Sequence, residues 1–314
     1  MKRQVKLFDP VIDDNELRAL ERILKGKSWA DGSGSKQVRK FEEEFQKETN
    51  SDSSIAVNSG TAALYLALSM ENIQNKEVIL PSMSFVSTAH AIIANKAKPR
   101  FADIDLDTLC IDPEEIEESL SKSTEIILPV HFGGLPSDLK KIEKICHRNH
   151  LTLIEDAAHA AGASYDGKKI GSHGKFVCFS FHPVKNITTG EGGMILTNNK
   201  EIAEKVNLYR SHGVTRDTNK MFNKNEGLWY YEQLLLGFNF RMNEIQASLG
   251  ISQMNSLDKF ISKRNEVSQM YMKNLKNLPL TFQKVRNEDL SAWHLFIIHL
   301  KLDQLELTRL EIYN

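Results

Sequence analysis

Cysteine and long apolar runs are both scarce in this sequence. Its three cysteines, Cys110, Cys146 and Cys178, are too few and too scattered for a disulfide framework or a zinc site built from paired cysteines. We therefore expect a reducing compartment. No run approaches the ~20 apolar residues that a membrane-spanning helix needs, and no apolar stretch follows the basic start MKR as in a signal peptide. These absences predict a cytoplasmic protein that does not contact a membrane.

Neither sign of charge predominates. The 40 Lys and Arg residues nearly balance the 41 Asp and Glu residues, so the basic surplus typical of a nucleic-acid-binding protein is missing. Proline (8) and glycine (17) are too rare for a collagen-like or low-complexity chain. The length of 314 residues suggests about two domains. Composition therefore favours a globular protein without nucleic-acid partners.

Short apolar runs alternate with helical patterns over the first two thirds of the chain. The expected strands are 53–58, 77–81, 98–104, 125–130, 151–156, 175–181 and 193–198. This alternation is typical of βαβ units, so we predict an α/β fold with a mostly parallel central sheet and helices on both faces. The last two strands are joined too closely for a parallel crossover, and one of them is expected to run antiparallel.

The pattern changes toward the C-terminus. Residues 214–236 have weak periodicity and are predicted to form a loop or excursion, whereas 243–275 are helical with a break near residue 256. Residues 291–300 are predicted to be a strand of a second, smaller unit, followed by the start of a helix. We expect a large domain over 1–250, and a connecting helix with an incomplete small domain over 251–314.

The segment NSGTAAL (58–64) runs from a strand directly into a helix. Free N–H groups at a helix start bind anions, and Gly60 followed by Thr61 would let a phosphate approach the backbone. An ordinary Ser or Thr helix cap is the alternative interpretation.

The segment LIEDAAHAAGA (153–163) places Asp156 at the end of a buried strand, where open α/β sheets bind ligands. His159 follows one helical turn later, so both side chains could face one pocket. A helix cap for Asp156 and a structural role for His159 are the alternatives.

The segment FSFHPVKNITTGEGG (179–193) places Lys185 between a strand and a glycine-rich turn. Lys185 is either an exposed loop lysine or a partly desolvated amine that can form a Schiff base with an aldehyde. No metal site is expected. The acidic residues Asp103, Asp105, Asp107 and Glu114 echo a calcium loop, but Thr108 stands where that loop requires glycine.

Together the three segments supply a phosphate cradle, an acid and a lysine, the parts that pyridoxal phosphate (PLP) chemistry requires. The whole chain from about residue 5 resembles the DegT-like sugar aminotransferases, which are PLP enzymes of fold type I. The resemblance is carried by these segments and by LPSMSFVSTAHAII (80–93), FADID (101–105), PVHFGG (129–134), RSHG (210–213) and LGFNFRMNEIQASLG (236–250).

The resemblance implies a role for each matching residue. Lys185 would hold PLP covalently, Asp156 would pair with the pyridine nitrogen, and His159 would lie near the phenolic oxygen. Phe85 would stack on the ring, while Gly60, Thr61 and Ser180 would hold the phosphate. Asn239 would reach the cofactor phosphate of the partner subunit in a homodimer with shared active sites. The substrate-side candidates are His182, His212 and Arg241.

The resemblance also implies a reaction. L-Glutamate would give its amino group to the 4-keto carbon of a UDP-linked 4-keto-6-deoxy-N-acetylhexosamine, as in pseudaminic acid or related surface-glycan biosynthesis. A UDP-4-keto-pentose or a dTDP-4-keto-6-deoxyhexose is the alternative acceptor. Some relatives carry His at the lysine position and dehydrate sugars, which Lys185 argues against. Family chains extend further than residue 314, so a non-catalytic PLP-binding or regulatory protein is an alternative of another class.

Overall fold

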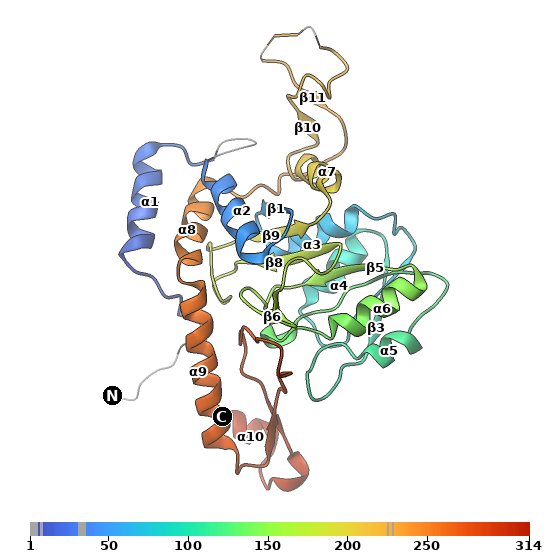
Figure 1. The fold of residues 1–314 in the computed structure, drawn as a ribbon, viewed down its shortest axis with the longest axis vertical. Helices are drawn as coiled ribbons and strands as arrows, with labels where there is room; N and C mark the ends of the chain where they lie inside the picture. The colour runs from blue at the N-terminus through green and yellow to red at the C-terminus, as the bar shows by residue number, and fades with distance from the viewer. Residues whose placement is uncertain (1–5, 7–8, 31–35, 225, 228) are drawn as a thin grey trace.

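The computed structural model describes residues 6, 9–30, 36–224, 226–227 and 229–314. A seven-stranded sheet crosses the centre of the molecule (Figure 1). In order across the sheet, its strands are β1 (Ser53–Val57), β9 (Gly193–Thr197), β8 (Phe176–Ser180), β5 (Thr152–Asp156), β4 (Thr124–Ile127), β2 (Glu77–Pro81) and β3 (Lys98–Ala102).

Strand β9 is the one that breaks the parallel arrangement. The strands from β3 to β8 pair parallel with their neighbours, whereas β9 pairs antiparallel with both β8 and β1. The short connection before β9 thus joins two antiparallel strands, as predicted. The mostly parallel α/β fold predicted from the sequence is also confirmed. Gly193 lies opposite both Val57 and Ser180, so the ends of β1 and β8 meet at one edge of the sheet.

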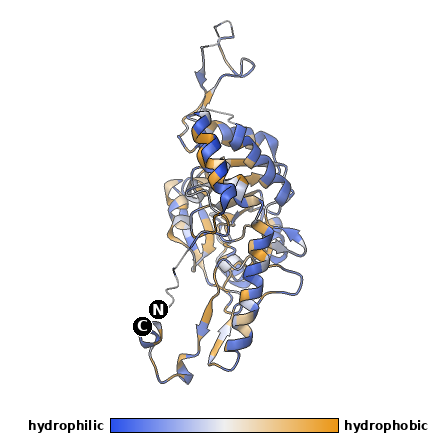
Figure 2. Ribbon diagram, turned by 90° about the vertical axis from the view of Figure 1, so that its left-hand side faces the viewer, coloured by the Kyte–Doolittle hydropathy of each residue, from blue (hydrophilic) through white to orange (hydrophobic). Residues whose placement is uncertain are grey.

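Helices cover both faces of the sheet. One face packs against α2 (Lys36–Thr49), α6 (Leu139–Asn149) and α8 (Glu244–Met254), and the other against α3 (Gly60–Ser69), α4 (Val86–Ala94) and α7 (Lys200–Arg210). Successive residues of a strand point to opposite faces. In β8, Val177 and Phe179 therefore join the first core, while Phe176 and Cys178 join the second. The hydropathy colouring shows both colours on these helices (Figure 2).

The chain leaves the sheet through a long helix. α9 (Leu257–Leu275) follows α8 after the break predicted near residue 256, and runs away from the sheet (Figure 1). Beyond it, β12 (Leu280–Phe282) pairs antiparallel with β13 (Ile298–Leu300). The remaining elements are α1 (Asp14–Gly26), α5 (Pro113–Glu118), η1 (Phe132–Gly134), β6 (Ser164–Tyr165), β7 (Lys168–Lys169), η2 (Leu302–Gln304) and α10 (Arg309–Tyr313).

The predicted strand over 291–300 is wrong for most of its length, because only Ile298–Leu300 is a strand. The backbone of Ala292 and Leu295 donates hydrogen bonds to the carbonyls of Gly134 and Gly133, at 2.9 and 3.1 Å. The apolar pattern of residues 291–297 thus reflects docking on the loop after β4, and only the last three residues, 298–300, pair in a second sheet.

The predicted excursion over 214–236 contains a short strand pair, β10 (Val214–Thr215) and β11 (Glu232–Gln233). It stands out from the body of the molecule in both views (Figures 1 and 2). Within the described part of the chain, no helix has the length and apolar character needed to cross a bilayer.

Candidate active site

A cavity of about 550 Å³ opens at the edge of the sheet where β1, β5 and β8 end. It brings together all but three of the residues predicted from sequence. Those that line it are Gly60, Thr61, Phe85, Asp156, His159, Ser180, His182 and Lys185.

One end of the cavity is the start of helix α3. Ser59 caps this helix, and its Oγ accepts a hydrogen bond from the N–H of Ala62 at 3.1 Å. A Cβ added to Gly60 would lie 2.7 Å from the Cβ of Ser180, so only glycine lets that strand end approach the helix start. The N–H groups of the first turn and the hydroxyls of Thr61 and Ser180 therefore surround a site suited to an anion. The cap and the anion site, posed as alternatives from sequence, are both present here.

Asp156 forms the acidic part of the cavity. Its carboxylate is 4% exposed, and it accepts hydrogen bonds from the Thr88 hydroxyl at 2.8 Å and the Ala158 N–H at 3.1 Å. Burial nevertheless raises the pKa of Asp156, with the opposing effects of Thr88, Ala158 and Lys185 being smaller. A buried carboxylate of this kind is best stabilised by a cationic partner such as a protonated ring nitrogen.

Thr88 is a contact that the sequence reasoning missed. It lies on α4, is fully buried, and contacts Asp156 across 68 residues of chain. Because its single hydroxyl hydrogen goes to Asp156, the 2.6 Å contact between the hydroxyls of Ser84 and Thr88 must have Ser84 as donor. The motif 80–93 contained both residues, but nothing in its spacing distinguishes them from ordinary helix hydroxyls.

Lys185 lies in the loop after β8, where its N–H donates a hydrogen bond to the carbonyl of His182 at 2.9 Å. Burial lowers the pKa of the Lys185 ammonium, and the negative charge of Asp156 opposes that shift only partly. The amine is therefore closer to the neutral, nucleophilic state than an exposed lysine is.

His159 is not one helical turn beyond Asp156, because residues 157–163 form turns instead of the expected helix. Asp156 consequently caps no helix there. Both side chains still line the same cavity. Burial, together with the positive charge of Lys185, lowers the pKa of His159 to about 3, so its imidazole is neutral.

His294 and Leu295 also line the cavity, although no motif pointed to them. They come from the docked segment that follows α9, more than a hundred residues after Lys185. Only the apolar run around them gave a signal, and that run was interpreted as a strand.

Asn239, His212 and Arg241 lie outside the cavity. Asn239 and His212 are exposed and Arg241 is half-buried. The carbonyl of Asn239 accepts a hydrogen bond from the Asn58 side chain at 3.4 Å. The backbone of Arg241 forms an isolated antiparallel β-bridge with Val57. This segment thus runs beside the chain that leads into Gly60 without reaching the site of its own subunit.

The arrangement as a whole suits PLP. A helix start with two hydroxyls fits a phosphate, a buried carboxylate fits a ring nitrogen, and an amine of lowered pKa fits an aldehyde. Together with a mostly parallel sheet, these features define a PLP-dependent transferase of fold type I.

Comparison with known proteins carries this further. The pattern of the DegT/DnrJ/EryC1/StrS aminotransferase family matches residues 10–312, and the chain belongs to this family. It is therefore a PLP-dependent sugar aminotransferase.

Two curated relatives are similar over nearly the whole chain. Uncharacterized protein MJ1066 of Methanocaldococcus jannaschii is 41% identical, over 96% of this chain and 78% of its own length. The spore coat polysaccharide biosynthesis protein SpsC of Bacillus subtilis is 36% identical, over 96% of this chain and 77% of its own.

Among solved structures, Helicobacter pylori PseC, an aminotransferase involved in the biosynthesis of pseudoaminic acid, superposes with a TM-score of 0.89. It is 30% identical to this chain, and the match covers 96% of this chain and 79% of PseC.

Proposed function

We propose that this enzyme transfers the amino group of L-glutamate to the 4-keto carbon of a UDP-linked 4-keto-6-deoxy-N-acetylhexosamine, for a pseudaminic-acid-type surface glycan. The observation that supports transamination is the position of Lys185. It lines the cavity together with Asp156, and the charge of Asp156 influences its pKa. The likeness to PseC supports the class of sugar. The three free, buried cysteines fit a cytoplasmic setting.

The proposal gives the chain's own residues the following parts. Thr61, Ser180 and the first N–H groups of α3 would hold the cofactor phosphate, and Asp156 would keep a proton on the ring nitrogen. The exposed ring of Phe85 would cover one face of the cofactor ring, which explains why a large aromatic is 70% exposed. The bound cofactor supplies stabilisation of the negative charge that develops at the carbon losing its proton.

Lys185 is the proton carrier in this scheme. With PLP held by the residues above, the amine of Lys185 would take the proton from the α-carbon of glutamate and move it during amino transfer. The same amine would return a proton when the keto sugar is the bound partner. The lowered pKa of Lys185 favours this role, because a neutral amine can accept a proton and an ammonium cannot.

A second copy of the chain completes the site in this proposal. Asn239 would contact the cofactor phosphate of the partner subunit, and Arg241, His212 and His182 would face the sugar nucleotide. Large apolar side chains of the protruding segment are exposed in the single chain, including Phe222 (89%), Trp229 (77%) and Leu236 (76%). A partner subunit would cover such side chains.

A panel of keto sugars tests the choice of acceptor. The PLP-loaded enzyme is incubated with glutamate and, separately, with UDP-4-keto-6-deoxy-N-acetylhexosamine, UDP-4-keto-pentose and dTDP-4-keto-6-deoxyhexose, and amino sugars are detected by mass spectrometry. The proposal predicts the highest kcat/KM for the first. A higher value for either other sugar would replace it with that acceptor, and no turnover of any of the three would show that the acceptor is a different keto sugar.

A further inference from the structure

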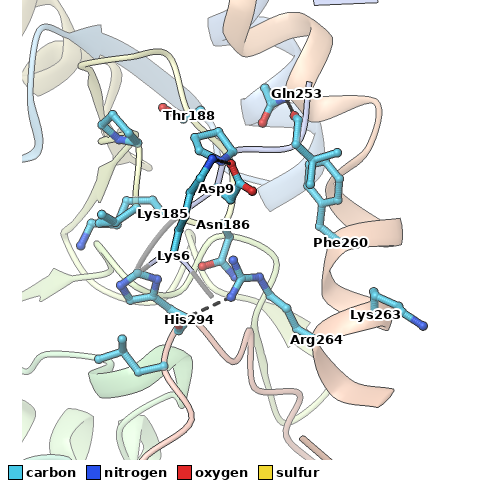
Figure 3. A pocket seen from close by; sticks show the side chains of 15 residues that line it. Lys6, Asp9, Lys185, Asn186, Thr188, Gln253, Phe260, Lys263, Arg264 and His294 are labelled. Carbon is cyan, nitrogen blue, oxygen red and sulfur yellow. Dashed lines mark hydrogen bonds and ion pairs between the residues drawn. The ribbon is translucent and has the colours of Figure 1, made fainter. Parts of the chain in front are cut away.

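His294 separates two cavities. The first is the 550 Å³ cavity described above. The second, of about 500 Å³, lies between α9, residues 6 and 9–11, and the loop that carries Lys185 (Figure 3). Lys185 and His294 line both. In Figure 3 the His294 ring lies below the Lys185 side chain and to the left of Arg264. A residue from the far end of the chain thus forms a wall beside the reactive lysine.

The backbone around His294 is held by residues 133–134, by Asn186 and by Arg264. A Cβ on Gly134 would lie 2.8 Å from the N–H nitrogen of Trp293, so glycine permits this close docking. Besides the two bonds to residues 133–134, the anchoring hydrogen bonds run from Asn186 Nδ2 to the Ala292 carbonyl at 2.7 Å, and from Arg264 Nη1 to the carbonyls of Trp293 and His294 at 3.0 and 3.4 Å. The position of the His294 ring therefore follows from the fold.

The ring of His294 packs against the ring of His159. Their centroids are 4.3 Å apart and their planes are inclined by 40°. On the other side, the N–H of Gly133 donates a hydrogen bond to Nδ1 of His159 at 3.4 Å. Because Nδ1 accepts, the hydrogen of a neutral His159 must be on Nε2. The two contacts together restrict both the rotation and the tautomer of His159.

The surroundings of the two histidines also favour the neutral form of both rings. The pKa of His294 is lowered to about 2 by burial, His159, Lys185 and Arg264, and that of His159 to about 3. Asp156, His182 and Glu191 also line the first cavity. Two neutral rings in contact are thus stable beside Lys185 and Arg264, whereas an imidazolium there would meet like charges.

We propose that His294 is a positioning residue for His159: its ring shields His159 from water and holds its orientation, so that Nδ1 stays on the Gly133 N–H and Nε2–H is the one donor that His159 offers at the cofactor's phenolic oxygen. Nδ1 of His294 is buried without a hydrogen-bond partner in the described part of the chain. The contact with His159 is therefore made by the packed rings and not by a hydrogen bond from Nδ1 of His294. The inference rests on the proposed function, in which His159 lies at that oxygen.

Ring-labelled histidine NMR of the cofactor-free protein tests the proposal. The His159 signals are assigned with His159→Gln, and the variants are His294→Ala, which removes the ring, and His294→Phe, which keeps a ring of similar shape without nitrogen. In the native protein and in His294→Phe, His159 should stay in the Nε2–H tautomer and not titrate between about pH 5 and pH 8. In His294→Ala its titration midpoint should rise by one pH unit or more, and the Nδ1–H tautomer should appear.

A second readout uses the PLP-loaded protein. The pH dependence of its visible absorbance should shift in His294→Ala and stay native in His294→Phe. An unchanged His159 in His294→Ala would overturn the proposal, and so would a His294→Phe variant that behaves like His294→Ala. Neither readout needs a sugar or glutamate, so a wrong acceptor in the proposed function would leave this test intact. If His294→Ala does not fold, His294→Leu replaces it with the same expectations.

Discussion

The Asp156 side chain is subject to opposing influences on its ionisation. Burial favours its neutral form, while Thr88, Ala158 and Lys185 favour the carboxylate. A cationic group placed against it would favour the carboxylate further. This is the physical reason for assigning it to a ring nitrogen that must keep its proton.

Replacing this carboxylate by an amide of the same shape isolates that role. Asp156→Asn should still bind PLP but should lower the rate of the glutamate half-reaction by about 10²-fold or more, as is typical when a group that stabilises developing charge is lost. Stopped-flow absorbance with glutamate alone measures this. A near-native rate in a variant that still holds PLP would show that the ring nitrogen does not depend on Asp156.

The same substitution should change the titration of Lys185. Asp156 raises the pKa of Lys185, whereas burial lowers it. Removing the negative charge should therefore lower that pKa further, so that the neutral amine appears at a lower pH. Reductive ¹³C-methylation of the cofactor-free protein, with Lys185→Ala to assign the signal, measures the midpoint. A midpoint that stays in place or moves to higher pH would contradict the electrostatic coupling of the two groups.

At the scale of elements, helix α3 begins at Gly60 after the Ser59 cap, and a larger residue at position 60 would collide with Ser180. Gly60→Ala should displace the helix start, weaken PLP binding and destabilise the fold by about 1–3 kcal/mol, the usual cost of overpacking. Gly26→Ala is the matched control, since a Cβ there would meet nothing within 4 Å. Fluorescence titration with PLP and thermal unfolding are the measurements. If the two variants bind PLP equally well, the close approach is not needed for the phosphate site.

Elements with local signals could be predicted from sequence. Apolar runs bounded by helical patterns predicted the seven strands. The short connection between the last two predicted that one of them runs antiparallel, and the structure shows that it is β9. Contacts between distant segments could not be predicted. The apolar run over 291–300 predicts a strand, but its backbone bonds to residues 133–134 instead. His294 and Thr88 were missed for the same reason, since only the folded chain brings them to His159 and Asp156.

At the scale of the whole molecule, the proposal of a site shared between two subunits concerns Asn239. It is exposed, lies outside the cavity of its own chain, and runs beside the approach to Gly60. A partner subunit would bring a second copy of this segment. The division into domains at residues 250–251 likewise stays a prediction, which limited proteolysis of the loops around α9 can examine.

Mixed dimers test whether Asn239 acts across the interface. Lys185→Ala and Asn239→Ala chains of the enzyme, each weakly active or inactive alone, are unfolded and refolded together. If Asn239 serves its partner, each mixed dimer has one site with both residues intact, and about a quarter of native activity returns on random pairing. If Asn239 serves its own chain, every site has a defect. Mixed dimers that are shown to form but are no more active than their parents would contradict the shared site.

The proposed function requires that nitrogen pass from glutamate to a keto sugar through Lys185. To follow it, ¹⁵N-glutamate and UDP-4-keto-6-deoxy-N-acetylhexosamine are supplied to the PLP-loaded enzyme, and the label is traced by mass spectrometry. We expect ¹⁵N at carbon 4 of the sugar and equimolar 2-oxoglutarate, both absent with Lys185→Ala. Label transfer that persists in Lys185→Ala, or amino sugar formed without ¹⁵N, would contradict the proposed function.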